Sequence, residues 1–381
     1  MSTVGEICAV MDRAYPPHLA ESWDHVGLIC GDPEAKVSKI AFALDCTQAV
    51  AERAVEIGAQ LLIVHHPLLL RGVNSVAANT PKGKVIHTLL NGGVALFAAH
   101  TNADSARPGV NDRLAELVGI VPGRPIAPKP ATGVDKWGVM VPVAAAEQLK
   151  AAVFAAGAGA LGDYAECAFQ FEGQGQFRPE AAADPFVGSQ GQLHHEPELR
   201  VEFVAPVTLR QRIQEALVSA HPYEEPAFDC VTIASFEDPE TACGLGRIGE
   251  LPEPMTLREF TQQVADALPV TEWGVRAAGD PEAMIKKVAV SSGAGDSFLD
   301  TVATLGVDVY VTSDLRHHPV DEYLRAGGPA VIDTAHWASE FPWCAQAAGV
   351  IADSDIDSVA SIDTEIIEIR TDPWTVSAHA Q

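Results

Sequence analysis

The hydrophobic positions of the first 130 residues form short, unbroken apolar runs that alternate with helical patterns. Unbroken runs are typical of strands that are buried on both faces. They predict strands at residues 39–44, 61–64 and 94–99, and the patterns around them predict helices at 49–58 and 84–90. The same texture returns late in the chain, with strands expected at 287–290, 307–312 and 330–332. Such strands separated by helices predict an α/β fold with a mostly parallel sheet, covered on both faces.

The middle of the chain has a different texture. Strands are expected at residues 137–143, 167–171, 199–204 and 228–233, and helices at 145–156 and 209–220. The resulting order, strand-helix-strand-strand-helix-strand, is that of the ferredoxin-like fold and is complete in about one hundred residues. We therefore predict a ferredoxin-like α+β domain at residues 135–244. It would be inserted into an outer α/β domain whose two halves are residues 1–134 and 245–381.

Composition and charge narrow the class of protein. The 381 residues include 25 Lys and Arg against 51 Asp and Glu, a formal net charge of −26. Such a chain repels phosphate backbones and anionic lipids, so neither general nucleic-acid binding nor membrane binding is expected. The seven cysteines form no CxxC pair, so no disulfide framework or thiolate zinc cluster is indicated. With no apolar run that could span a bilayer and no signal-peptide pattern, we expect a cytoplasmic protein.

Polar side chains of the ligand type follow the carboxyl ends of the predicted strands. They are Asp45, His65, His66, His100 with Asp104 after it, residues 291–295, Asp314 with His318 beyond it, and Asp333. A parallel sheet gathers such residues along one edge, which is where open α/β sheets bind ligands. Strand ends that simply meet solvent are also polar. That explanation covers one or two of these positions, but not three strand ends that carry histidine.

A histidine and a carboxylate four residues apart, His336 and Glu340, lie on one face if a helix begins there. Alone, such a pair is usually a surface contact. Together with His65, His66 and Asp104 it gives five nitrogen and oxygen ligands. Two ions about 3.5–4 Å apart need about this number, with positions left for water. No cysteine is among these five candidate ligands, which favours a hydrolytic or Lewis-acid site over a structural zinc.

The adjacent histidines His65 and His66 need a local change to reach one site, because neighbouring side chains in a strand point to opposite faces. Pro67 ends the hydrogen bonding of the strand and holds the residue before it extended. The two rings can then splay toward two different ions. The alternative is one buried and one exposed histidine.

Several longer motifs resemble the Nif-three-like proteins, a dinuclear-metal-centre family whose members carry the name GTP cyclohydrolase 1 type 2 homologue. The matching stretches are Trp23–Leu28, Ala43–Thr47, His65–Leu68, His100–Asp104, Thr312–His318, Asp333–Glu340 and Thr371–Trp374, the last resembling the family's terminal strand. By this resemblance, the family's metal ligands correspond to His65, His66, Asp104, His336 and Glu340, with Glu340 bridging two ions. The resemblance also implies a toroidal homohexamer whose metal sites face an internal cavity.

The expected insert resembles the PII/CutA-like domain of the longer family members. The stretches that carry this resemblance are Gly157–Tyr164, Gly173–Pro179 and His221–Pro226. Prolines bracket the last of these, so we interpret it as a structural or interface loop, with binding of a regulatory ligand as the alternative.

Three positions depart from the family pattern. Ser313 and Ala335 stand where the family has glycine, and His25 replaces an asparagine. Alanine disfavours positive φ, so a tight turn at residue 335 is expected to be repacked. The departures bear on the surroundings of the ligands rather than on the ligand set.

Asp45, Asp314 and His318 are the candidate catalytic residues, which could orient ligands or handle protons. His318 is the expected proton-transfer residue, because nearby cations would tune its pKa. Asp45 and Asp314 could instead cap the helices that follow them. His100 is either a further ligand or the residue that holds the next turn. Residues 291–295 resemble an anion-holding turn, with ordinary α/β packing as the alternative.

The expected function is a dinuclear metal-dependent hydrolase that acts on a small molecule, with a nucleotide as the candidate that the resemblance implies. Two divalent ions per subunit would lower the pKa of a bridging water and polarise the substrate. Histidine and carboxylate ligands suit zinc, iron or manganese. The alternative is a metal-containing hexameric scaffold or regulatory protein whose insert senses a small molecule or a partner.

Overall fold

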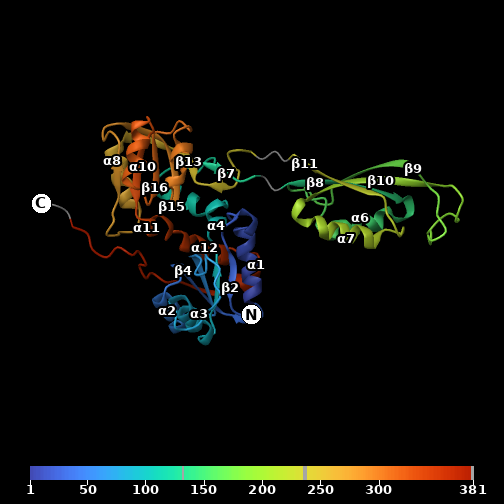
Figure 1. Ribbon diagram of the computed structural model, residues 1–381, viewed down its shortest axis with the longest axis horizontal. Coiled ribbons are helices and arrows are strands. Elements are labelled where there is room, and N and C mark those ends of the chain that lie inside the picture. Colours follow the sequence, from blue (N-terminus) through green and yellow to red (C-terminus); the bar gives the residue numbers. More distant parts are fainter. Residues whose placement is uncertain (131–132, 235–237, 379–381) are drawn as a thin grey trace. The chain divides into compact units, whose positions relative to one another are not determined.

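The computed structural model describes residues 1–130, 133–234 and 238–378, which form two compact units (Figure 1). Unit 1 combines the chain from Met1 to Lys129 with the chain from Asp238 onward, and unit 2 is the segment between them. The architecture is a mixed α/β fold with several sheets. Within the described ranges, no helix combines the length and the apolar character that a membrane crossing requires.

The first sheet of unit 1 has five strands in the order β18-β4-β5-β6-β2. Their bounds are β18 (Asp363–Ile366), β4 (Lys39–Asp45), β5 (Leu61–His66), β6 (Ala95–Ala98) and β2 (Gly27–Cys30). The first four are parallel, and β2 runs antiparallel to β6. The strands predicted at 39–44, 61–64 and 94–99 are therefore present.

Helices cover both faces of this sheet because both faces are apolar. On one face pack α1 (Val4–Ala14) and α12 (Trp343–Ala352), and on the other α2 (Gln48–Glu56) and α3 (Pro81–Asn91). Phe42 and Ile63 point into the first of these cores, and Leu62 and Val64 into the second. Two faces lined by such side chains require continuous apolar strands.

The second sheet of unit 1 has the order β13-β15-β16-β17-β14. Its strands are β13 (Arg247–Thr256), β15 (Met284–Ala294), β16 (Val309–Ser313), β17 (Ala330–Thr334) and β14 (Arg276–Ala278). The three central strands are parallel and the two edge strands antiparallel. One face is covered by α5 (Val110–Leu117), α8 (Leu257–Ala267) and α11 (His336–Glu340), the other by α9 (Leu299–Val302) and α10 (His317–Arg325). The expectation of one sheet edge is wrong, because the early and late strands each form their own sheet.

The chain's return into unit 1 is held by a fully buried arginine. Arg247 donates two hydrogen bonds to the carboxylate of Asp112, and others to the carbonyls of Ala106, Gly244 and Gly246. A buried guanidinium is tolerated only when its donors are paired. Arg247 thus ties the start of the second half of unit 1 to the first half.

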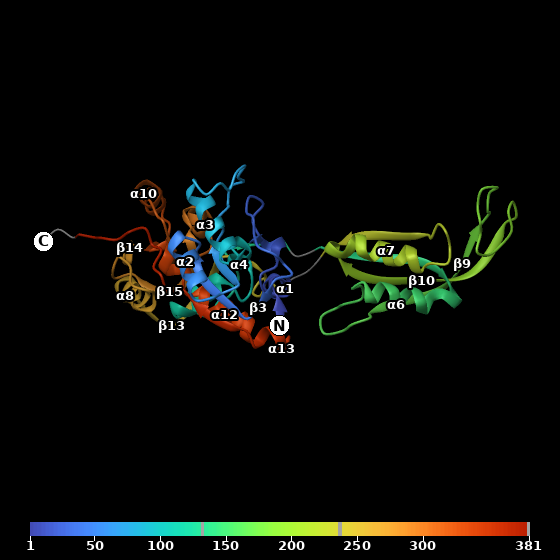
Figure 2. The same cartoon turned by 90° about the horizontal axis from the view of Figure 1, so that it is seen from below.

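Unit 2 consists of one antiparallel sheet with two helices on one face, and both Figure 1 and Figure 2 show this arrangement. Its elements in chain order are β8 (Val134–Pro142), α6 (Ala146–Ala155), β9 (Ala168–Phe177), β10 (His194–Pro206), α7 (Arg210–Ala220) and β11 (Phe228–Ile233). The strand order is β11-β8-β10-β9. Trp137, which is fully buried, stacks between Phe203 and Phe228 and anchors a separate core.

Short elements complete the described chain. They are β1 (Ser2–Thr3), β3 (Lys36–Val37), β7 (Ala127–Pro128), β12 (Gly244–Leu245), α4 (Thr101–Ser105), α13 (Asp357–Ala360) and the 3₁₀ turns Pro17–Leu19, Val143–Ala145, Val207–Leu209 and Asp296–Phe298. Of these, α4 matters most for function, because it follows β6 and carries Asp104.

Candidate metal centre

The structure brings together all five residues that the sequence singled out as metal ligands. They come from both sheets of unit 1: His65 and His66 end β5, Asp104 lies in α4, and His336 and Glu340 lie one turn apart in α11. In space they form two groups, His65 with Asp104 and Glu340, and His66 with His336 and Glu340. Each group could hold a metal ion, and Glu340 belongs to both.

The two carboxylate oxygens of Glu340 face different groups. Its Oε1 lies 3.8 Å from His65 Nε2, which in turn lies 3.7 Å from Asp104 Oδ1. Its Oε2 lies 2.9 Å from His66 Nε2 and 3.0 Å from His336 Nε2. The Nε2 atoms of His66 and His336 are 3.4 Å apart. One carboxylate therefore lies between two sets of nitrogen and oxygen atoms.

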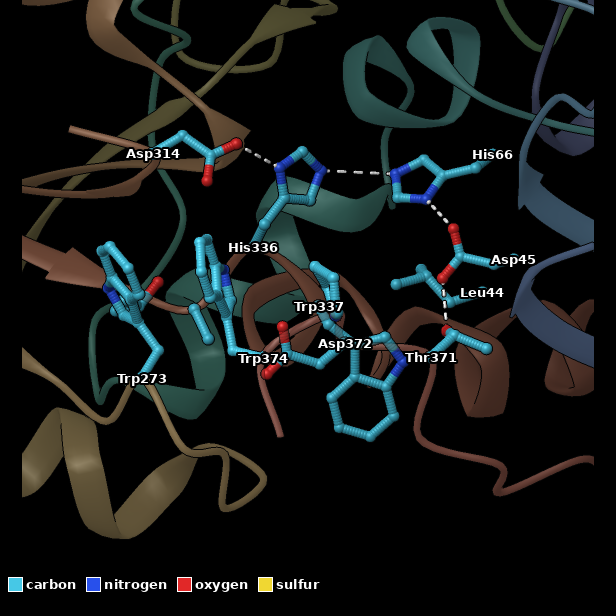
Figure 3. Close-up of a pocket in the computed structure, with 13 residues that line it drawn as sticks. Leu44, Asp45, His66, Trp273, Asp314, His336, Trp337, Thr371, Asp372 and Trp374 are labelled. Carbon is cyan, nitrogen blue, oxygen red and sulfur yellow. Dashed lines mark hydrogen bonds and ion pairs between the residues drawn. The ribbon is translucent and has the colours of Figure 1, made fainter. Parts of the chain in front are cut away.

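The other ring nitrogen of each histidine is already engaged. His65 Nδ1 donates to the carbonyl of Ala99 at 2.8 Å. His66 Nδ1 donates to Asp45 Oδ1, and His336 Nδ1 to Asp314 Oδ2, each at 2.7 Å (Figure 3). An imidazole that donates through Nδ1 presents the lone pair of Nε2 when it is neutral. All three lone pairs then point at carboxylate oxygens or at one another, an arrangement that a cation satisfies.

The carboxylates of the cluster favour positive charge on the groups beside them. Glu340 raises the pKa of His336 to about 11, against the opposing effect of burial. Burial acts to lower the pKa of His66, but Glu340 and Asp45 together raise it to about 10. Protonated His66 and His336 therefore supply the positive charge that the carboxylates of Glu340, Asp45 and Asp314 favour. The atoms thus fit a metal centre by charge as well as by position.

The deepest part of the cluster contains groups without hydrogen-bond partners. His65 is fully buried, and its Nε2 has no hydrogen bond to any described residue. Glu340 is 4% exposed; burial raises its pKa, but His336 and His66 hold it well below the usual value. Burial raises the pKa of Asp104, partly offset by His65. Such burial is costly unless the groups are paired or coordinate a metal.

A glycine makes room for the carboxylate of Glu340. A Cβ added at Gly293 would lie 2.3 Å from Glu340 Oε1, and the φ of this residue is +60°. Residues 291–294 belong to β15, and the N–H groups of Ser292 and Gly293 donate to Asn111 and Ser339. The interpretation of residues 291–295 as an anion-holding turn is therefore wrong, because these donors are engaged.

The two adjacent histidines both reach the cluster. His66 lies opposite Asp45 in the register of β5 and β4, which brings its Nδ1 to the carboxylate. His65 points inward and packs against Trp343, with ring centroids 5.2 Å apart. The histidine rings lie 5.0 Å apart and tilted by 47°. The two rings splay toward the two groups. The alternative of one buried and one exposed histidine is therefore wrong.

The candidate catalytic residues divide into two kinds. Asp45 and Asp314 hydrogen-bond the histidines, and the capping interpretation is wrong, since Thr47 and Arg316 are the N-cap residues of α2 and α10. Asp314 has φ +57°, a strained conformation that short polar side chains tolerate. His318 is exposed on α10, and the described structure shows no hydrogen bond or ion pair that joins it to the centre.

His100 supports the turn after β6. Its Nδ1 donates to Asp24 Oδ2, which also accepts from the hydroxyl of Thr101. Its ring lies 5.2 Å from that of His65, and together with His65 and His66 it forms a third group that could hold an ion. Both sequence interpretations of His100 thus remain compatible with its position.

The departures from the family pattern are accommodated locally. Ala335 has φ −72° and ψ 133°, extended backbone that any residue adopts, so the repacked turn expected there is wrong. Ser313 ends β16, where its hydroxyl hydrogen-bonds Thr334 and Ser339. His25 is exposed, and its N–H donates to Asp24.

A cavity of about 230 Å³ opens beside His66 and His336. Its other lining residues include Trp273, Trp337, Trp374 and Asp372, as Figure 3 shows. The sequence reasoning missed this wall, because the tryptophans are far apart in the chain. Residues 371–374 form no strand, so the resemblance to a terminal strand is wrong at this segment. They instead run along the cavity, and Thr371 donates to Asp45.

The fold and this cluster define an α/β protein with a buried histidine–carboxylate centre suited to metal ions. Residues 2–373 match the family described as Duf34/NIF3 (NGG1p interacting factor 3), and the chain belongs to that family.

Relatives agree in length and fold. A Mycobacterium tuberculosis protein named GTP cyclohydrolase 1 type 2 homolog is 51% identical over 374 residues, covering 98% of this chain and 97% of the relative. A Bacillus subtilis protein of the same name is 37% identical over 335 residues, 88% of each chain. The crystal structure of a Bacillus cereus protein related to NIF3 superimposes with a TM-score of 0.80 at 33% identity, covering 98% and 99% of the two chains.

Proposed function

We propose that this protein is a dinuclear metal-dependent hydrolase that acts on a small molecule. The observation that carries the proposal is the position of Glu340, whose two oxygens face two separate groups of ligand atoms. A single ion would use one such group. Two groups that share one carboxylate are what a pair of divalent ions requires.

His65, Asp104 and Glu340 would hold one ion, and His66, His336 and Glu340 the other. Two ions there would lower the pKa of a water and polarise a bond of the substrate. Zinc, iron and manganese suit these ligands. The remaining work falls to the protein: Ala99, Asp45 and Asp314 fix the ring orientations through Nδ1.

Several finer features belong to the proposal. The relatives' name, GTP cyclohydrolase 1 type 2 homolog, supports a nucleotide as the small-molecule substrate. The strand order of unit 2, β11-β8-β10-β9, supports a ferredoxin-like, PII/CutA-like domain at residues 135–244, inserted between outer halves 1–134 and 245–381. A homohexamer and a cytoplasmic location complete the proposal. His318 stays a candidate for proton transfer.

The second candidate function is a metal-containing hexameric scaffold or regulator. The observation that favours it is the separate core of unit 2, which is not needed to build the centre in unit 1. In this case the insert senses a small molecule or a partner, and the ions stabilise the assembly.

Metal content per chain, measured by plasma mass spectrometry, tests the centre. We expect about two ions in the wild type and a loss in both His65→Ala and Glu340→Ala. His87→Ala, an exposed histidine on α3, is the matched control and should retain both ions. Metal-replete protein without ions, or ligand variants that keep them all, would contradict the assignment.

Turnover then separates the two functions. The purified protein is screened with nucleotides, phosphoesters and amides, with and without a chelator. Hydrolysis that disappears on chelation and in Glu340→Ala supports the enzyme. Full metal occupancy without turnover supports the scaffold. His318→Ala should keep its metal and lose rate if that residue transfers protons.

A further inference from the structure

The cavity beside the metal centre has an aromatic wall. Trp273 and Trp374 lie with ring centroids 5.7 Å apart, and the indole of Trp337 closes another side. Trp374 is more than half exposed. At about 230 Å³, the cavity is below the roughly 300–1,000 Å³ of pockets that enclose a whole drug-sized ligand. It has room for one ring system of a larger molecule.

A buried carboxylate without a partner lines the same cavity. Asp372 is 7% exposed, and no described residue gives it a hydrogen bond or an ion pair; its Oδ2 is fully buried. Figure 3 shows it among the three tryptophans. Leaving a carboxylate in this state costs free energy, which a donor group would recover. The neighbouring hydroxyl of Thr371 does not serve, because it donates to Asp45.

The charge of the lining excludes one kind of occupant. Asp45, Asp314 and Asp372 all line the cavity, and no lysine or arginine among the described residues does. Arg276 stacks on Trp273 at 4.6 Å but is paired with Asp333. A phosphate group would meet three carboxylates there with no lysine or arginine to offset them, and the charge of His66 and His336 is already engaged by Glu340, Asp45 and Asp314. The cavity is therefore suited to the uncharged or cationic part of a ligand.

Resting on the proposed hydrolase function, we propose that this cavity binds the ring of the substrate, a planar aromatic heterocycle with adjacent N–H donors. Trp374 and Trp273 hold the ring by stacking, and Asp372 accepts its N–H groups. Two neighbouring N–H donors match the two oxygens of one carboxylate, and seating the ring requires the half-exposed Trp374 to swing aside and uncover Oδ2. Indole rings stack on any flat heterocycle, so the carboxylate supplies the selectivity.

One short segment links ring recognition to the metal ligands. Thr371 donates to Asp45, which orients His66, and the next residue, Asp372, reads the ring. His66 and His336 line the same cavity, so a ring seated there lies beside the centre. Asp372 is thus a specificity-determining residue and not a metal ligand.

The test is ligand binding rather than turnover. Guanosine carries two adjacent N–H donors on a planar ring, and inosine lacks one of them. Affinities for both are measured by calorimetry and tryptophan fluorescence on the metal-loaded protein. We expect wild type to prefer guanosine about tenfold. Asp372→Asn should weaken guanosine binding about 10- to 100-fold and remove most of the preference.

Matched variants separate recognition from structure. Glu368→Gln, an exposed acid-to-amide change on the same segment, should bind both nucleosides like wild type. Trp374→Leu should weaken both nucleosides alike, and Trp374→Phe should restore most of the binding. Metal content is measured for every variant and should equal that of the wild type.

The inference is overturned by no binding of either nucleoside to metal-loaded wild type, by unchanged preference in Asp372→Asn, or by equal losses in Glu368→Gln. A change in oligomer mass of Asp372→Asn by light scattering, without a change in nucleoside affinity, would assign the carboxylate to a contact between chains and also overturn it. Failure of the hydrolase proposal is distinguishable, because Asp372-dependent discrimination would then persist without turnover.

Discussion

The carboxylate of Glu340 occupies the space where residue 293 would have its side chain, since a Cβ there would lie 2.3 Å from Oε1. Gly293 lies in β15 and Glu340 in α11, so a strand and a helix approach closely at the centre. The positive φ of Gly293 adds a second requirement for glycine at this position.

Gly293→Ala should therefore displace the carboxylate of Glu340. We expect metal content to fall by at least half, and thermal stability to fall by about 1–2 kcal/mol from the unfavourable φ. Plasma mass spectrometry and thermal unfolding check the two effects. Gly327→Ala, whose φ is also positive but whose added Cβ would meet open space, should lose stability without losing metal. Full occupancy in Gly293→Ala would show that the carboxylate can shift.

Asp45 and Asp314 should control metal affinity without binding the ions. Asp45→Asn and Asp314→Asn weaken the orienting bonds to His66 and His336, and each is expected to lower affinity about 10- to 100-fold. Competition with a coloured chelator measures this loss. Asp321→Asn, at an exposed surface ion pair on α10, should have wild-type affinity.

Loading the centre with metal should stabilise unit 1. At a free metal concentration about 100-fold above Kd, binding contributes about 2.7 kcal/mol, or a rise in Tm of about 5–10 °C. The stabilisation arises because the ions pair the buried groups of His65, Asp104 and Glu340. Differential scanning calorimetry with and without chelator gives the shift. Glu340→Ala should show little or none of it.

Arg247 should be among the residues most sensitive to substitution. Arg247→Met removes the two shortest charge-assisted bonds of the buried Asp112 and leaves it the N–H of Gly109 and the more distant guanidinium of Arg107. We expect a loss of about 3–5 kcal/mol in the free energy of unfolding. Arg258→Met, at an exposed ion pair on α8, should cost less than about 1 kcal/mol. Urea unfolding followed by circular dichroism compares them, and equal losses would contradict the role of Arg247.

Unit 2 contains a pH-dependent ion pair. Arg210, through two hydrogen bonds, lowers the pKa of Asp135 below its usual value. The unfolded chain then binds more protons than the folded chain as the pH drops below about 4, so the stabilisation is present above that pH and is lost below it. Urea unfolding of wild type and Asp135→Asn should differ most at neutral pH and converge in acid. A constant difference would contradict the pair's titration.

The parts of the fold that the sequence predicted are those with strong local patterns. The runs 39–44 and 61–64 are strands because their side chains fill cores on both faces, which leaves an unbroken apolar signature. The existence of two sheets was not predictable, since strand pairing depends on contacts between distant segments. The edge strand β13 was missed for the same reason, as its burial is irregular.

The residues of the candidate site likewise differ in whether the sequence could identify them. His65, His66, His336 and Glu340 were identifiable because ligand-type residues at strand ends and at helical spacing leave a signal in the chain. The stretch Thr371–Trp374 was noted only for its resemblance to a terminal strand, and nothing in it marked Asp372 as a site residue, because the significance of Asp372 comes from burial without a partner. The exclusion of Asp45 and Asp314 as helix caps likewise needed the observed cap residues.

The centre joins residues that lie very far apart along the chain. His66 and His336 are 270 positions apart, and the whole of unit 2 is encoded between them. During synthesis, at about 5–20 residues per second, the first histidines therefore leave the ribosome well before their partners exist. A centre built from both groups cannot form until Glu340 has emerged. If the proposed ions bind at this centre, binding is expected late in synthesis or after it, once both halves of unit 1 are present.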